Sequence, residues 1–262
     1  MHGAKPAGIA GLFLFAVLTC IHCSLFGQVK SPATHVKYAV APVPFVACES
    51  DGQIGPINAP SGRAKTMAIP AEAAQRLAYY KAKEGVGVLA PKGWHCFGVY
   101  GSSGAALYVS PDPINSADVL SSSWKGFAGP VVQISLEYGG TSGRFAVAKT
   151  IARAFPARKE FVEGVIAEGI EPASSFPYGP YPVDSLKYRG ENVVEFSTPA
   201  RAEGLGTDSR LQKNDSPIRG AVLLVGEAPD LIRVCVRLPS KNIDLSQLII
   251  QQAEREAARL GN

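Results

Sequence analysis

Segments with a two-residue hydrophobic period are grouped along this chain of 262 residues, and the grouping constrains the fold more than any other feature. The clearest alternation is at 131–138, where apolar residues at 132, 134, 136 and 138 alternate with Gln133, Ser135 and Glu137. Further strands are predicted at 86–90, 94–100, 105–110, 186–197, 218–225 and 231–238. The segments 94–100 and 105–110 form a predicted hairpin around the Gly-Ser-Ser-Gly turn at 101–104.

Helical periodicity occurs in separate blocks. Helices are predicted at 67–83, 142–155, 158–168, and from about 244 to Gly261. Pro156 ends the second of these, and Gly261 ends the last. Because strands follow strands instead of alternating with helices, the pattern predicts an α+β fold with a largely antiparallel sheet.

The start and the end of this pattern carry a resemblance to a known architecture. The sequence Ala-Pro-Lys-Gly-Trp at 90–94 opens the predicted sheet, and a long helix closes the chain. In this order of elements, residues 85–260 resemble the Mog1/PsbP-like α/β/α sandwich. The resemblance implies a sheet covered by helices, in a fold that hosts varied non-enzymatic and accessory roles. It carries over no site residue.

The N-terminus is typical of an export signal. Lys5 is followed by 24 residues without a formal charge, up to Lys30, with an apolar centre at 9–18. This predicts a signal peptide at 1–27, cleaved between Ser24 and Gly27, and a periplasmic or extracellular protein. Two alternatives stay open: residues 7–27 are retained as a membrane anchor, or Cys20 is lipidated.

Residues 28–66 differ in composition from the rest of the chain. Five prolines (32, 42, 44, 56 and 60) interrupt every possible helix there, 37–45 is the one segment expected to be extended, and Asp51-Gly52 is expected to be a turn. We therefore predict a Pro-rich extended arm at 28–66 that lies over a single α+β domain at 67–262.

Cysteine usage adds a constraint on the arm. Cys20 and Cys23 belong to the predicted leader, which leaves Cys48, Cys96 and Cys235. In an oxidising compartment two of these three are expected to pair. Cys48 and Cys96 lie in polar, Gly-containing surroundings, whereas Cys235 lies inside an apolar strand, so we predict a Cys48–Cys96 disulfide and a free Cys235 thiol. Three reduced core cysteines are the alternative.

Several kinds of chemistry find little support in the sequence. The formal net charge of +4 comes without a run of Lys or Arg, so we expect no nucleic-acid partner. Outside the predicted leader, His35 and His95 are the only histidines, too few for a catalytic zinc site, and no cofactor is expected. The S-x-x-K match at Ser122–Lys125 lacks the further motifs of penicillin-recognising enzymes. No catalytic residue is assigned.

One group of cations suggests a ligand. Alternation in 231–238 puts Arg233 and Arg237 on one strand face with Cys235 between them, and Lys187 and Arg189 likewise share a face of their own strand. If these strands are neighbours, one sheet face carries four cations around the thiol and could hold a small anionic ligand. A solvated or ion-paired sheet face is the alternative reading.

Two functions therefore remain. The first is a secreted, non-catalytic binding or accessory module of the cell envelope, which binds an envelope protein or a small anionic ligand and contacts a membrane only if its N-terminal segment is retained. The alternative is an envelope-associated hydrolase with a site in the loops 48–53 and 94–103. An enzyme requires Glu49, Asp51 and His95 to converge within hydrogen-bond reach. Loops that are joined only by a disulfide favour the binding module.

Overall fold

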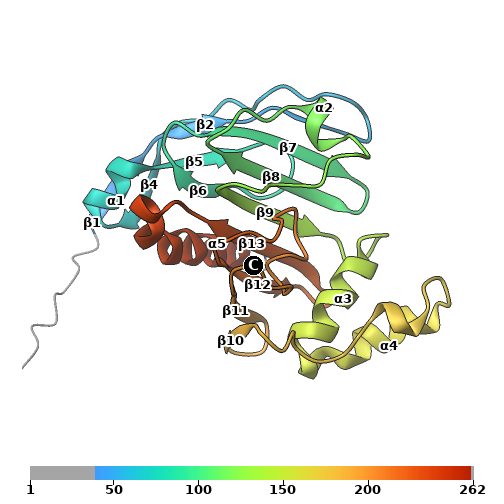
Figure 1. Cartoon of the computed structure of the whole chain (residues 1–262). Coiled ribbons are helices and arrows are strands. Elements are labelled where there is room, and N and C mark those ends of the chain that lie inside the picture. Colours follow the sequence, from blue (N-terminus) through green and yellow to red (C-terminus); the bar gives the residue numbers. More distant parts are fainter. Residues whose placement is uncertain (1–38, 261–262) are drawn as a thin grey trace, which may run out of the picture. The chain divides into compact units, whose positions relative to one another are not determined.

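A computed structural model describes residues 39–260, so the predicted leader and the start of the predicted arm lie outside the described residues. An eight-stranded sheet dominates it, in the order β10-β11-β12-β13-β9-β8-β7-β3 (Figure 1). Its strands are β3 (Ser50–Gly52), β7 (His95–Gly101), β8 (Gly104–Ser110), β9 (Val131–Glu137), β10 (Ser185–Tyr188), β11 (Val193–Thr198), β12 (Ile218–Val225) and β13 (Asp230–Arg237). All neighbours are antiparallel except β3 and β7. The predicted α+β class is confirmed.

One face of this sheet packs against the C-terminal helix α5 (Ser246–Leu260) and two small sheets (Figure 1). The small sheets pair β1 (Ala39–Val43) with β4 (Lys65–Ile69), and β5 (Leu77–Lys81) with β2 (Phe45–Ala47) and β6 (Val88–Pro91). Ile249 and Ala253, four residues apart on α5, are fully buried against the sheet. This layer forms the larger hydrophobic core.

The opposite face is covered in two separate parts. Helices α3 (Arg144–Ala154) and α4 (Lys159–Ala167) cover strands β9 to β13, where Val147, Ile151 and Phe155 are buried. A smaller cluster, built on Phe97 and Tyr108 with α2 (Ser116–Val119), covers β7 and β8. Helices thus lie on both faces of the sheet, but two small sheets share one face with α5, so the structure agrees with the resemblance to an α/β/α sandwich only in this coarse respect.

The described part of the predicted arm belongs to the sheets. Its strands β1, β2 and β3 each pair with a later strand, and β3 forms an edge of the main sheet. The expected turn at Asp51-Gly52 is therefore wrong, because both residues belong to β3. A Cβ at position 52 would overlap the carbonyl oxygen of Tyr100, so glycine is required here for close strand approach.

The predicted helix at 67–83 is also wrong. The structure has β4, Pro70, the short helix α1 (Ala71–Arg76) and then β5. Tyr79 and Tyr80 are buried, and β5 pairs with strands on both sides. The Ala-rich composition favoured a helix, but tyrosines fit a buried strand better and tertiary pairing decides.

The predicted strand at 186–197 divides into β10 and β11, with Gly190 at a positive φ of 71° in the turn between them.

The predicted disulfide is present. Cys48 and Cys96 are bonded, with their Cα atoms 5.5 Å apart, and Cys235 is a buried free cysteine. The bond joins the segment between β2 and β3 to β7, and so fastens the proline-rich segment to the main sheet. Closing a loop with a sequence separation of 48 residues stabilises the fold by about 4 kcal/mol in the chain-entropy model.

We predict that Cys48→Ser and Cys96→Ser each lower the free energy of unfolding by about 2–5 kcal/mol, the range for loss of a native disulfide. The double variant should lose no more than either single variant, because both changes remove the same bond. Denaturant unfolding without reductant measures this. Cys235→Ser is the control, since its effect should add to that of Cys48→Ser. A double-variant loss equal to the sum of the single losses contradicts the prediction.

Candidate functional site

The structure separates the four cations that the sequence predicts to form one cluster. Arg233 and Arg237 share a face of β13 and flank Cys235, as predicted. Lys187 belongs to β10, and two strands lie between β10 and β13. Through the register Lys187↔Glu195↔Ala221↔Val234, it projects from the opposite face, the one that α5 covers. Arg189 ion-pairs with Glu195 and with Glu254 of α5. The single four-cation face is therefore wrong, because local alternation determines neither strand order nor register.

Arg233 and Arg237 fasten loops across the sheet. Both are buried, and neither forms an ion pair with a carboxylate within residues 39–260. Arg237 Nη1 lies 3.4 Å from each of three carbonyl oxygens, at 127, 128 and 129, and Nη2 donates to the carbonyl of Gln212. Arg233 donates to the carbonyl of Asp208 and to Thr150 Oγ1. These bonds compensate part of the cost of burying each guanidinium.

The buried thiol between these arginines is not a nucleophile. Cys235 is fully buried, and burial raises its pKa to about 11, against a smaller opposing effect of the Arg233 charge. Since the thiolate is the reactive form, the thiol is inert in the folded protein.

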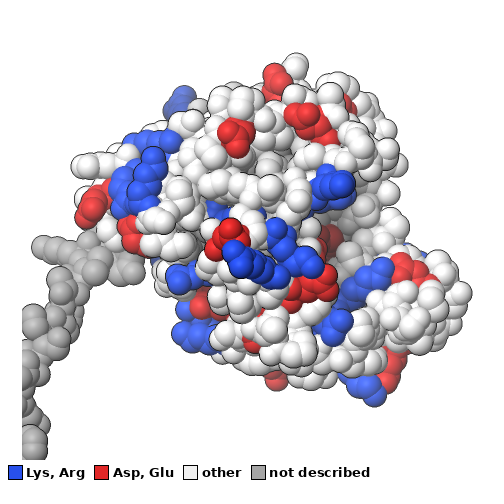
Figure 2. All heavy atoms as spheres, viewed as in Figure 1, with Lys and Arg blue, Asp and Glu red and all other residues white. Residues whose placement is uncertain are grey.

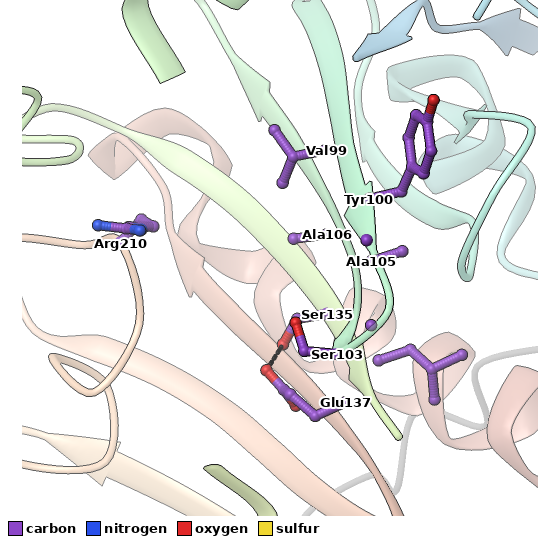
Figure 3. A pocket seen from close by; sticks show the side chains of 11 residues that line it. Val99, Tyr100, Ser103, Ala105, Ala106, Ser135, Glu137 and Arg210 are labelled. Atoms are coloured by element: carbon purple, nitrogen blue, oxygen red, sulfur yellow. Dashed lines mark hydrogen bonds between the residues drawn. The ribbon is translucent and has the colours of Figure 1, made fainter. Parts of the chain in front are cut away.

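A pocket opens on the same sheet face, at the end of the β7–β8 hairpin (Figure 3). We call it the hairpin pocket. Its volume is about 340 Å³, and small residues (Gly104, Ala105, Ala106 and Ser135) form much of its lining. Polar side chains in the lining include Ser103, Ser135, Glu137 and Arg210. Figure 3 shows Ser103, Ser135 and Glu137 gathered together, with Arg210 standing apart from them.

Local sequence explains how the hairpin places these groups. Gly104 has a φ of 149°, and a Cβ there would overlap the carbonyl oxygen of Leu136. Glycine thus allows the turn to pack directly against β9. The carbonyl of Ser103 then accepts a hydrogen bond from the backbone N–H of Tyr138, at 2.9 Å. This contact brings the turn beside Glu137.

Glu137 is the least compensated polar group of the pocket. Its Oε1 accepts a hydrogen bond from Ser135 Oγ at 2.9 Å, whereas Oε2 is sealed from solvent and has no partner among the described residues. Burial raises the pKa of Glu137, and the Arg233 charge and the Ser135 hydrogen bond oppose this effect. A carboxyl group with one oxygen unused, in the wall of a pocket, is a candidate ligand-binding group.

Arg210 supplies the opposite charge. Its Cζ lies 5.6 Å from the centroid of the Trp124 ring, and its side chain is exposed. Its backbone N–H donates to Gln133 Oε1 at 2.9 Å, which holds this loop residue to β9. Within the described chain, Arg210 forms no ion pair with a carboxylate.

Sequence reasoning noted Glu137 and Ser135 on the polar side of the strand at 131–138 but did not assign them to a site. An alternating pattern is typical of a sheet with one solvated face, so it does not reveal that loops cover the polar face. The one available signal was three polar residues in succession on that face, a pattern that ordinary surface strands share. Arg210 lies in a loop whose position depends on the buried arginines of β13.

The residues of the hydrolase alternative lie in two segments that are joined by backbone pairing and by a disulfide. No hydrogen bond or ion pair joins Glu49, Asp51 and His95 in the described structure, and Asp51 Oδ1 accepts from the adjacent N–H of Gly52 at 2.7 Å. Among residues 39–260, no group of three or more His, Cys, Asp or Glu side chains is placed to hold a metal ion.

We predict that Arg237→Met lowers the free energy of unfolding by about 1–3 kcal/mol, because it leaves buried carbonyl oxygens unpaired. Arg219→Met, an exposed arginine of neighbouring β12, is the matched control and should change stability by less than about 0.5 kcal/mol. Urea unfolding measures both. Equal stability of Arg237→Met and the wild type would show that these carbonyl groups do not depend on the guanidinium.

We further predict that ionisation of Glu137 destabilises the fold. The pKa of Glu137 is higher in the folded protein than in the unfolded chain, so the protonated side chain favours the folded state. This contribution to the free energy of unfolding is complete below the pKa of the unfolded chain and is lost as the pH rises through the pKa of the folded protein. The stability of Glu137→Gln relative to wild type should therefore increase from about pH 4 to about pH 8. Exposed Glu227→Gln is the control. A pH-independent difference for Glu137→Gln contradicts the prediction.

Comparisons with known proteins give no relative from which a function could be transferred. No family model, no curated protein and no solved structure matches this chain. Within residues 39–260, no helix has the length and apolar character needed to cross a membrane. The case for a function therefore rests on the chain's own residues.

Proposed function

We propose that this protein is an exported, non-catalytic binding module that holds a small polar ligand in the hairpin pocket. The observation that carries the proposal is the Glu137 carboxyl group, whose Oε2 atom is buried in the pocket wall without a partner. Leaving such an atom unpaired costs free energy, and a ligand in the pocket recovers that cost when the Glu137 side chain turns to bring Oε2 within reach of the ligand's donor.

The lining defines the chemistry of the ligand. Near Glu137 the ligand presents a hydroxyl or amine donor, with the hydroxyl groups of Ser103 and Ser135 beside it. Toward Arg210 it presents an acceptor or an anionic group, which a guanidinium binds well. Gly104 and Ala106 have no bulky side chains, so they leave room for the middle of the ligand between Glu137 and Arg210. A small zwitterion or a hydroxy acid meets all these requirements.

Two features support export. The sequence at 1–27 has the pattern of a signal peptide, and the Cys48–Cys96 disulfide is of the kind that forms in oxidising compartments.

Figure 2 shows basic and acidic side chains next to one another near the middle of the face in view. That mixture fits a module that recognises a small ligand in a pocket better than one that binds a long polyanion there.

The binding module is favoured over the hydrolase by geometry. A hydrolase needs a nucleophile, a base that takes its proton, and a group that orients the base. In the hairpin pocket, Ser135 donates to Glu137, and no histidine lines the site. Glu49, Asp51 and His95 are not linked by any hydrogen bond in the described part of the chain.

The test is ligand-observed NMR with a panel of free amino acids and small hydroxy acids. We expect at least one panel member to bind the wild type, and Ala106→Leu to abolish binding because the larger side chain occupies the pocket. Glu137→Gln should weaken binding about tenfold or more, as expected for loss of a hydrogen bond to a charged group. Ser102→Ala is the control, since this exposed turn residue does not line the pocket.

The proposal fails if no panel member binds the wild type, or if Ala106→Leu binds as well as the wild type does. Far-ultraviolet circular dichroism of each variant establishes that it is folded. A folded Glu137→Gln variant with unchanged affinity would remove Glu137 from the binding group.

A further inference from the structure

A second pocket has Arg233 in its lining and shares no lining residue with the hairpin pocket. It is formed between α3, the loop at 175–181 and β13, and its volume is about 260 Å³. We call it the α3 pocket. Lys149 and Arg153 lie four residues apart, on one face of α3, and both line it. Arg233 contributes a third cation from the sheet.

Arg153 is the cation with the most unused hydrogen-bonding capacity. Its Cζ lies 4.2 Å from the centroid of the Tyr181 ring, and Nη1 lies 3.2 Å from the carbonyl oxygen of Gly179. It forms no ion pair within residues 39–260. A guanidinium has five N–H donors, so most of those of Arg153 remain available.

The other charged groups at the pocket are largely engaged. Lys149 Nζ pairs with Glu171 at 2.8 Å, and an ammonium group has further donors to offer. Asp208 lines the pocket, and its Oδ1 accepts a hydrogen bond from the Tyr181 hydroxyl at 2.7 Å. Three cations therefore face two carboxylates, and the excess charge is positive.

Arg233 connects the walls of the α3 pocket through hydrogen bonds. It donates to Thr150 Oγ1 on α3 and to the carbonyl of Asp208, and so ties two walls to β13. Its Nε is buried and lacks a partner in the described structure, so its charge is not fully compensated. A pocket whose cations are held in place loses little entropy when a ligand binds.

We propose that the α3 pocket binds a small organic oxyanion. Arg153, Lys149 and the hydroxyl of Ser175 would donate to the anionic group. The Tyr181 ring and Pro177 would contact an apolar or aromatic remainder, for which a volume of about 260 Å³ leaves room beyond a phosphate or carboxylate group. This site is separate from the hairpin pocket and does not depend on the function proposed for it.

The test is a calorimetric titration with three probes at constant ionic strength: phenyl phosphate, inorganic phosphate and phenol. We expect phenyl phosphate to bind the wild type more tightly than either of the other probes, because it alone has both the oxyanion and the ring. Lys149→Gln and Arg153→Gln should each weaken phenyl phosphate binding about tenfold or more.

Two control variants make the result specific. Lys159→Gln removes an exposed cation of α4 that does not line the pocket, and should leave phenyl phosphate affinity unchanged. Ala106→Leu, which blocks the hairpin pocket, should also leave it unchanged, so failure of one site is distinguishable from failure of the other. Because Arg153 also contacts Tyr181, the exposed Lys149 gives the variant that is safer for folding.

Three outcomes would overturn the proposal: phenyl phosphate binding no more tightly than phenol or inorganic phosphate, affinity unaffected by Lys149→Gln, or the same loss in Lys159→Gln as in Lys149→Gln. The last outcome would mean that phosphate responds only to net charge.

Discussion

The burial of the Arg233 and Arg237 guanidinium groups on β13 determines how loops cover the sheet face opposite α5. The strand is buried on both sides, with Ile232, Val234 and Val236 under α5 and Arg233 and Arg237 on the opposite side. A buried charge without compensation would cost more than the fold can tolerate. Loop carbonyls compensate part of this cost for both arginines, and because a carbonyl group needs no particular side chain, the two loops are held by their backbones.

This constraint explains why functional candidates lie in loops that the sheet holds firmly. The segments at 126–129 and 207–212 also bond to one another, with Phe127 N–H donating to the Arg210 carbonyl at 2.7 Å and Gln212 N–H donating to the Phe127 carbonyl at 2.9 Å. Arg210 reaches the hairpin pocket from one of these segments, and Asp208 reaches the α3 pocket. Loops positioned by a rigid scaffold are common places for binding groups.

Local periodicity predicted the elements better than it predicted their neighbours. The hairpin at 94–110 and the strands at 131–138 and 231–238 follow from alternation, and the cysteine surroundings were enough to predict the disulfide. The prediction of a helix at 67–83 was wrong because it gave the Ala-rich composition more weight than the strand preference of Tyr79 and Tyr80, which lie in β5. The four-cation cluster failed for a different reason. Whether Lys187 and Arg233 share a face depends on the pairing register across the strands between them, and their distance depends on the strand order, and no local pattern encodes either.

The place of the hairpin pocket follows from how the second face of the sheet is covered. Helices α3 and α4 bury one half, the cluster around Phe97 and Tyr108 buries the other, and Phe127 packs against both. Between these two parts, β9 presents Gln133, Ser135 and Glu137 in succession. Gln133 accepts from the backbone N–H of Arg210 and Ser135 donates to Glu137, and of these three side chains only Glu137 has a buried polar atom without a partner in the described structure. An apolar residue at 137 would fill this junction by ordinary packing, whereas a glutamate leaves an acceptor that a ligand or a water molecule can satisfy once the side chain turns toward the pocket.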